Sequence, residues 1–130
     1  MRNVIFKGIE SCGNAPKKIV LEQLIVAMAT ENKAYLEDKL ASDIEWNFVG
    51  KKVYKGIRNL EAALKELPIC EEIIIETVIT HGRDGAVNGV LLCREETVGF
   101  SHIFQFASAG KQARLIKLTT YLNTIGELND

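Results

Sequence analysis

The order of the periodic segments constrains this chain most, because helical spacing dominates its beginning and strand alternation its second half. Asn14 and Pro16 form a helix-start signal, and apolar residues then recur at helical spacing as far as Met28. We predict that this helix ends near Asn32. The Asn32 side chain can cap a short second helix over residues 33–40.

Shorter segments follow these two helices. Apolar and polar residues alternate over 43–49, which predicts a strand, and a brief second strand is expected at 53–54. Residues 57–67 have helical spacing again, and Pro68 stops this third helix.

The second half of the chain predicts four long consecutive strands, over residues 71–81, 86–94, 97–106 and 113–123. The Asp84-Gly85 pair is the predicted turn of the first hairpin. Consecutive antiparallel strands with helices segregated to one face make an α+β fold. We therefore expect a curved antiparallel or mixed sheet wrapped around three helices, in the order ααββα followed by four strands, with a cone-shaped interior.

Length and charge limit the partners. The 130 residues are expected to form one domain, with 1–13 as an N-terminal extension and 126–130 as a tail. The 16 basic and 17 acidic residues give no strong field for nucleic acid. No stretch approaches the ~20 apolar residues that span a bilayer, and no signal peptide is recognisable, so no membrane partner and a cytoplasmic location are expected.

The cysteines and glycines indicate neither a metal site nor a cofactor. Cys12, Cys70 and Cys93 are scattered singly without a CxxC spacing, which argues against a disulfide framework and against zinc. The glycine-rich candidates lie in turns and lack the strand–loop–helix context of a phosphate cradle. No metal and no cofactor are therefore expected.

Several motifs together resemble one known superfamily. The segment from Leu40 to Gly50, LASDIEWNFVG, resembles the signature of nuclear transport factor 2-like proteins, whose small bacterial members are called SnoaL-like or polyketide-cyclase-like. Lys55-Gly56-Ile57, Phe104-Gln105-Phe106 and the ending from Tyr121 to Thr124 fit the same pattern, so the resemblance covers about residues 15–125. It implies a cystatin-like fold, with a curved sheet and three helices enclosing a conical pocket. It implies no particular reaction, because the fold hosts enzymes and binding modules alike.

Comparison with ketosteroid isomerase, a member of that superfamily, tests one reaction. Its mechanism uses a carboxylate base on the first strand, a tyrosine from the first helix and a carboxylic acid on a late strand. The resemblance carries these positions onto Asn47, the neighbourhood of Ile25, and His102. An amide cannot accept a proton at neutral pH, so the isomerase mechanism is disfavoured.

His102 is the strongest candidate for chemistry. It alternates with four apolar residues and should face the interior: Val98, Phe100, Phe104 and Phe106. Desolvation should then lower its pKa. Two interpretations stay open, a catalytic acid/base and a core histidine whose ring is satisfied by one hydrogen bond.

The expected ligand-binding residues are Trp46, Asn47, Tyr54, Phe100 and Phe104. Alternation with Ile44 and Phe48 directs Trp46 inward, whereas the family comparison directs its neighbour Asn47 inward. Both cannot hold on a regular strand, because successive side chains point to opposite faces. Tyr54 is expected at the mouth of the pocket.

The last strand suggests a partner. Leu115, Thr119 and Tyr121 alternate with Lys117 on one face, which is too apolar for a fully solvated sheet surface. Homodimers through the outer sheet face are common in the superfamily that the chain resembles. We expect a homodimer through this face.

Three functions are compatible with these patterns. The first is a small-molecule binding protein whose mostly apolar pocket takes a small hydrophobic molecule. The alternative is an enzyme, an isomerase, cyclase or dehydratase, that acts on a hydrophobic carbonyl or cyclic substrate with His102 as acid/base. The third is an interaction domain without a pocket. An open pocket that His102 reaches favours the first two, and a pocket filled by Trp46, Phe100 and Phe104 favours the third.

Overall fold

The computed structural model describes residues 3–8 and 16–127 of the chain. Its helical segments are α1 (Pro16–Thr30), α2 (Lys33–Lys39), a 3-10 turn (Ile57–Asn59) and α3 (Leu60–Leu64). Its strands are β1 (Ile5–Lys7), β2 (Leu40–Phe48), β3 (Lys52–Lys55), β4 (Cys70–His81), β5 (Asp84–Cys93), β6 (Glu96–Phe106) and β7 (Leu115–Glu127).

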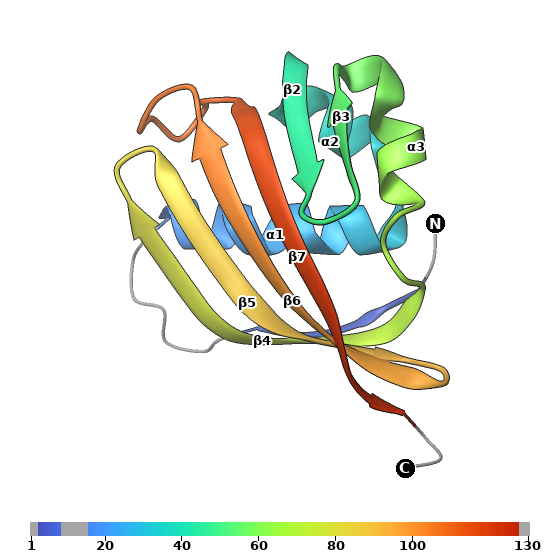
Figure 1. The fold of residues 1–130 in the computed structure, drawn as a ribbon. Coiled ribbons are helices and arrows are strands. Elements are labelled where there is room, and N and C mark those ends of the chain that lie inside the picture. The colour runs from blue at the N-terminus through green and yellow to red at the C-terminus, as the bar shows by residue number, and fades with distance from the viewer. Residues whose placement is uncertain (1–2, 9–15, 128–130) are drawn as a thin grey trace.

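All seven strands form one mixed sheet in the order β1-β4-β5-β6-β7-β2-β3. The β4 to β7 run is antiparallel throughout, whereas the β1–β4 and β2–β7 pairs are parallel. The long strands bend strongly, and α1 crosses one face of the curved sheet (Figure 1). The predicted α+β architecture is therefore confirmed, with one strand more than the predicted order.

The additional strand, β1, lies within the segment predicted to be an extension. Ile5, Phe6 and Lys7 pair in parallel with Glu72 to Ile74 at the edge of the sheet. The apolar triplet Val4-Ile5-Phe6 is too short to show an alternation, so its pairing with β4 could not be predicted. Residues 9–15, with the predicted start signal at Asn14, lie outside the described part of the chain.

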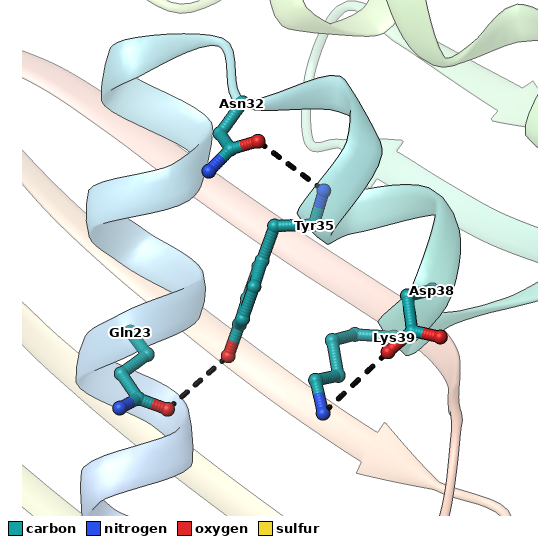
Figure 2. Close-up of polar contacts among 5 residues, drawn as sticks. All are labelled: Gln23, Asn32, Tyr35, Asp38 and Lys39. Carbon is teal, nitrogen blue, oxygen red and sulfur yellow. Dashed lines mark hydrogen bonds and ion pairs between the residues drawn. The ribbon is translucent and has the colours of Figure 1, made fainter.

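The junction between α1 and α2 follows the prediction. The side chain of Asn32 accepts a hydrogen bond from the backbone N–H of Tyr35 at 3.2 Å, as Figure 2 shows. This bond satisfies one of the free N–H groups at the beginning of α2. The third predicted helix is shorter than expected, because a 3-10 turn precedes α3 and α3 ends at Leu64.

The first hairpin turn was predicted two residues too late. His81 pairs with Asp84, so the two turn residues are Gly82 and Arg83. Gly82 has φ 59, a conformation that glycine adopts without steric cost at the first position of a tight hairpin turn. Gly85, predicted as a turn residue, is buried inside β5 against Leu21.

A bulge in β7 reverses the predicted orientation of one side chain. Phe106 pairs with Leu115 and Gln105 with Lys117, so Ile116 is an extra residue on β7. Leu115 therefore points inward and is 1% exposed, whereas it was predicted on the outer face. Lys117 and Tyr121 are exposed as expected, and Thr119 is half-buried.

Candidate functional site

A buried network of three side chains connects neighbouring strands of the sheet. Thr120 of β7 lies opposite His102 of β6 on one side and Phe48 of β2 on the other. Trp46 Nε1 donates a hydrogen bond to Thr120 Oγ1 at 2.8 Å, and His102 Nδ1 lies 2.8 Å from the same oxygen. Trp46, Thr120 and His102 are each at most 4% exposed. One hydroxyl therefore connects an indole and an imidazole in the interior.

His102 is held in apolar surroundings. Its ring lies 5.1 Å from the Phe100 ring and 5.8 Å from the Phe104 ring, centroid to centroid. Burial lowers the pKa of His102 to about 3, so the ring is neutral at pH 7. The predictions that His102 is buried and that its pKa is lowered are confirmed. In the described part of the chain, Thr120 is its only hydrogen-bonding partner.

Each tautomer of neutral His102 gives Thr120 a different role. Trp46 occupies one acceptor site of the hydroxyl in both cases. If His102 Nδ1 is unprotonated, it accepts the hydroxyl proton of Thr120, and the hydroxyl oxygen keeps one free lone pair. If Nδ1 carries a proton, it donates to the hydroxyl oxygen, and the hydroxyl proton is free for another acceptor. Thr120 can therefore donate to a third group or accept from it, according to that group's own chemistry.

A cavity of about 410 Å³ lies beside this network. Thr120 forms part of its wall, and the apolar part comes from β2, β6, β7 and the segment after α3: Phe48, Val98, Leu122, Leu67 and Pro68. Phe48 and Val98 are buried, so this part of the wall lies on the inner face of the curved sheet. The cavity therefore has an apolar wall that includes Thr120, the residue whose hydroxyl bonds Trp46 and His102.

Charged residues form the other part of the cavity wall: Lys51, Lys65, Glu66 and Glu96. Glu66 accepts a hydrogen bond from the Tyr54 hydroxyl through Oε2, and its Oε1 lies 3.4 Å from Lys51 Nζ. The Tyr54 hydrogen bond, more than the Lys51 charge, holds the pKa of Glu66 below its usual range. Glu66 is therefore ionised and occupied at neutral pH, which makes it a weak proton acceptor.

The structure resolves the conflict between Trp46 and Asn47. Trp46 points into the interior, whereas Asn47 lies on the opposite face of β2, half-buried and opposite Val53 of β3. The expectation that Asn47 faces the pocket is therefore wrong, because β2 is regular at this point. The Trp46 ring stacks on Phe48 at 4.9 Å, and Phe48 reaches the cavity wall.

The remaining predicted ligand-binding residues lie near the cavity without lining it. Phe100 and Phe104 are buried around His102 and, with Trp46, fill the part of the interior where the pocket was expected. By the criterion given above, this filled interior favours an interaction domain, and the cavity beside Thr120 is a separate space. Tyr54 meets the cavity only through its bond to Glu66. His102 likewise reaches it only through Thr120.

Thr120 is the residue of the candidate site that sequence reasoning missed. A signal was present, because Thr120 lies between Leu118 and Leu122 in the inward alternation of β7. The same kind of signal, a polar residue in an apolar row, identified His102. Within the described residues, no three His, Cys, Asp or Glu side chains gather as a metal site would require. None of the helices described is long and apolar enough to cross a membrane.

Comparison with known proteins identifies the fold and no closer relationship. No protein-family model matches the chain, and no curated protein matches it either. Solved structures do. An NTF-2 like protein of unknown function from Burkholderia xenovorans LB400 superimposes with a TM-score of 0.69 at 16% identity, over 88% of this chain and 90% of that one.

Two further structures have names that suggest enzymes. A candidate ketosteroid isomerase from Kribbella flavida has a TM-score of 0.70 at 11% identity, over 86% of this chain and 81% of that chain. A candidate SnoaL-like polyketide cyclase from Jannaschia sp. CCS1 has a TM-score of 0.61 at 12% identity, over 85% and 90%. The chain therefore has the nuclear transport factor 2-like fold that SnoaL-like and ketosteroid isomerase-like proteins share.

Proposed function

We propose that this protein binds a small, mostly apolar molecule in the cavity beside Thr120. The observation that carries the proposal is a cavity whose apolar residues adjoin Thr120, the buried residue whose hydroxyl bonds Trp46 and His102. The volume of the cavity, about 410 Å³, lies in the range of ~300–1,000 Å³ common for small-molecule sites. An apolar molecule with one carbonyl or hydroxyl group fits this combination.

The charges favour binding over proton abstraction. A general base works best when its pKa lies near the working pH. His102, with a pKa of about 3, is far below that range, and the carboxylate of Glu66 is occupied by Tyr54 and Lys51. Asn47, at the position where an isomerase has its base, lies on the outer face.

One observation supports the enzymatic alternative. The hydrogen bond between Thr120 and His102 connects the cavity wall to a titratable ring, so a proton on the hydroxyl can be exchanged with the imidazole. In that alternative the protein acts on a hydrophobic carbonyl or cyclic substrate as an isomerase, cyclase or dehydratase. The names of the candidate isomerase and cyclase with the same fold agree with it.

Titration with the neutral fluorophore N-phenyl-1-naphthylamine tests the binding proposal. We expect saturable binding to one site, with enhanced probe fluorescence and a change in Trp46 emission. Leu122→Trp fills the cavity and should abolish this binding. Ile125→Trp, three residues along β7 at a side chain that is 55% exposed, is the matched control and should bind as the wild type does.

The outcome separates the hypotheses. Equal binding by Leu122→Trp and wild type, or no saturable binding at all, contradicts the proposal. Two results together would instead establish the enzymatic alternative. The wild type turns over a substrate, and His102→Phe lowers kcat for it at least ~10²-fold with little change in KM.

A further inference from the structure

A second cavity lies between α1, α2 and the β6–β7 connection. It measures about 140 Å³ and shares no lining residue with the cavity beside Thr120. Val20, Phe106 and Ala113 give it an apolar side. Its volume exceeds the ~10–15 Å³ that admits one water molecule and is well below the ~300 Å³ of a drug-sized pocket. A small polar group is therefore the occupant that fits.

The polar side of this cavity is cationic. Lys39 from α2 and Lys111 and Arg114 from the β6–β7 connection line it, against one carboxylate, Asp38. Lys39 Nζ lies 3.7 Å from Asp38 Oδ2, so one of the three cations is partly compensated. In the part of the chain that the structure describes, the side chains of Lys111 and Arg114 have no ion-pair partner. The chain as a whole carries a net charge of −1, so this excess of positive charge is local.

A hydrogen bond between the two helices joins two residues that line the same cavity. The Tyr35 hydroxyl donates to Gln23 Oε1 at 3.2 Å across α1 and α2, as Figure 2 shows. With its oxygen occupied, the Gln23 amide has two N–H donors left. Gln23, Tyr35 and Lys39 all line the cavity.

Lys17 does not line the cavity, but it places a further positive charge on the Phe106 ring, which does. Its Nζ lies 4.0 Å above the centre of the Phe106 ring and donates to the Gly110 carbonyl oxygen at 3.2 Å. This bond ties the first turn of α1 to the β6–β7 connection that carries Lys111 and Arg114. Lys17 therefore contributes charge while holding that connection in place.

We propose that this second cavity binds a small oxoanion, the phosphate or carboxylate group of a ligand. Arg114 supplies a planar fork of N–H donors that suits both groups, and Lys39 and Lys111 supply charge. This site is independent of the proposed function, because the two cavities have separate walls.

Amide chemical shifts of the ¹⁵N-labelled chain, titrated with inorganic phosphate at constant ionic strength, test the proposal. We expect saturable shifts at Gln23, Tyr35 and residues 111–114, and none around Thr120. Arg114→Gln should weaken binding at least tenfold, and Asp38→Asn should tighten it severalfold because the one carboxylate is removed. Lys55→Gln, an exposed lysine of β3 remote from the cavity, is the matched control and should bind phosphate as the wild type does.

A parallel titration with acetate distinguishes the two anions. Saturation by phosphate alone supports a phosphate group, and saturation by acetate alone supports a carboxylate group. Lys111→Gln gives a second readout if Arg114→Gln folds poorly, and it should weaken binding severalfold. Shifts that never saturate, that sodium chloride reproduces, or that Lys55→Gln weakens as much as Arg114→Gln does would overturn the proposal.

Discussion

Thr120 connects more of the interior than any other small polar residue described. Its oxygen is the common partner of an indole from β2 and an imidazole from β6, and none of the three side chains meets bulk water. A buried donor or acceptor that loses its partner costs about 1–3 kcal/mol, more than a typical hydrogen bond contributes. We therefore expect Thr120 to determine the stability of the network.

Thr120→Val tests this role at nearly constant shape. The substitution removes the partner of both Trp46 and His102, so we expect the free energy of unfolding to fall by about 2–4 kcal/mol. His102→Phe removes one hydrogen bond only and should cost about 1–3 kcal/mol. Thr119→Val, at the neighbouring half-buried residue, is the control and should stay within about 0.5 kcal/mol. Urea denaturation measures all three, and equal losses for both threonines would contradict the network.

The pKa of His102 predicts a dependence of stability on pH. The folded state protonates His102 near pH 3, whereas the unfolded chain does so near the ordinary pKa of ~6.5. Between these values the unfolded state binds more protons, so stability is present above pH ~6.5 and is lost as the pH falls toward 3.

Unfolding at pH 7 and pH 5 measures this effect. The His102 contribution to the loss of stability should be about 2 kcal/mol between these two pH values. His102→Phe should lose that much less stability over the same interval. Parallel pH profiles for wild type and His102→Phe would show that the ring titrates normally.

At the scale of elements, the curvature of the sheet depends on local irregularities. The β4–β5 pairing shifts register between Ile75 and Thr77, directly beside Gly89 of β5. A Cβ atom at Gly89 would lie 2.1 Å from the Ile74 carbonyl oxygen, which is backbone and cannot rotate away. A side chain is therefore excluded where β4 bends, and glycine permits the close approach of the two strands.

Gly89→Ala should lower the free energy of unfolding by about 1–3 kcal/mol, because the strands must separate to accept the methyl group. Gly99→Ala on β6 is the matched control, since its nearest contact would be Ile125 Cγ2 at 3.5 Å, an ordinary van der Waals distance. Thermal unfolding of both variants measures the difference. Equal melting temperatures would mean that β4 and β5 can move apart freely.

Sequence periodicity predicts these elements well where it is long and regular. β4 to β6 lie within two residues of their predicted bounds, and the inward row of β6 places His102 correctly. The bulge at Ile116 and the turn at Gly82 depend on pairing with other strands, so local patterns could not predict them. The cavity depends on which large side chains fill the cone. Phe100 and Phe104 fill the part predicted to be open, and the free volume lies beside Thr120.

At the scale of the whole molecule, the outer face of the sheet exposes large apolar side chains. Ile79 of β4, Ile103 of β6 and Tyr121 of β7 are 58%, 40% and 45% exposed. Ile79 and Ile103 flank Ala86 in one cross-strand row. Leu115 no longer belongs to this face, but the surface stays apolar without it. The expected homodimer through this face stays a prediction.

Light scattering after size exclusion at micromolar concentration measures the oligomeric state. We expect a dimer of the 14.5 kDa chain. Ile103→Lys should convert it to a monomer that still binds the neutral fluorophore, because Ile103 and the cavity lie on opposite faces of the sheet. Ile69→Lys replaces a side chain that is 65% exposed outside the sheet and should leave the dimer intact. A 14.5 kDa wild-type species would refute the prediction.

The parallel pairing of β2 with β7 has a consequence for the order in which the chain folds. His102 and Thr120 are 18 residues apart within one hairpin, whereas Trp46 and Thr120 are 74 apart. Closing the longer loop costs more chain entropy, so we expect the hairpins from β4 to β7 to form before β2 joins them. The single tryptophan of the chain lies on β2, so a change in its emission during refolding should report when β2 joins the sheet and the hydroxyl of Thr120 gains its second partner.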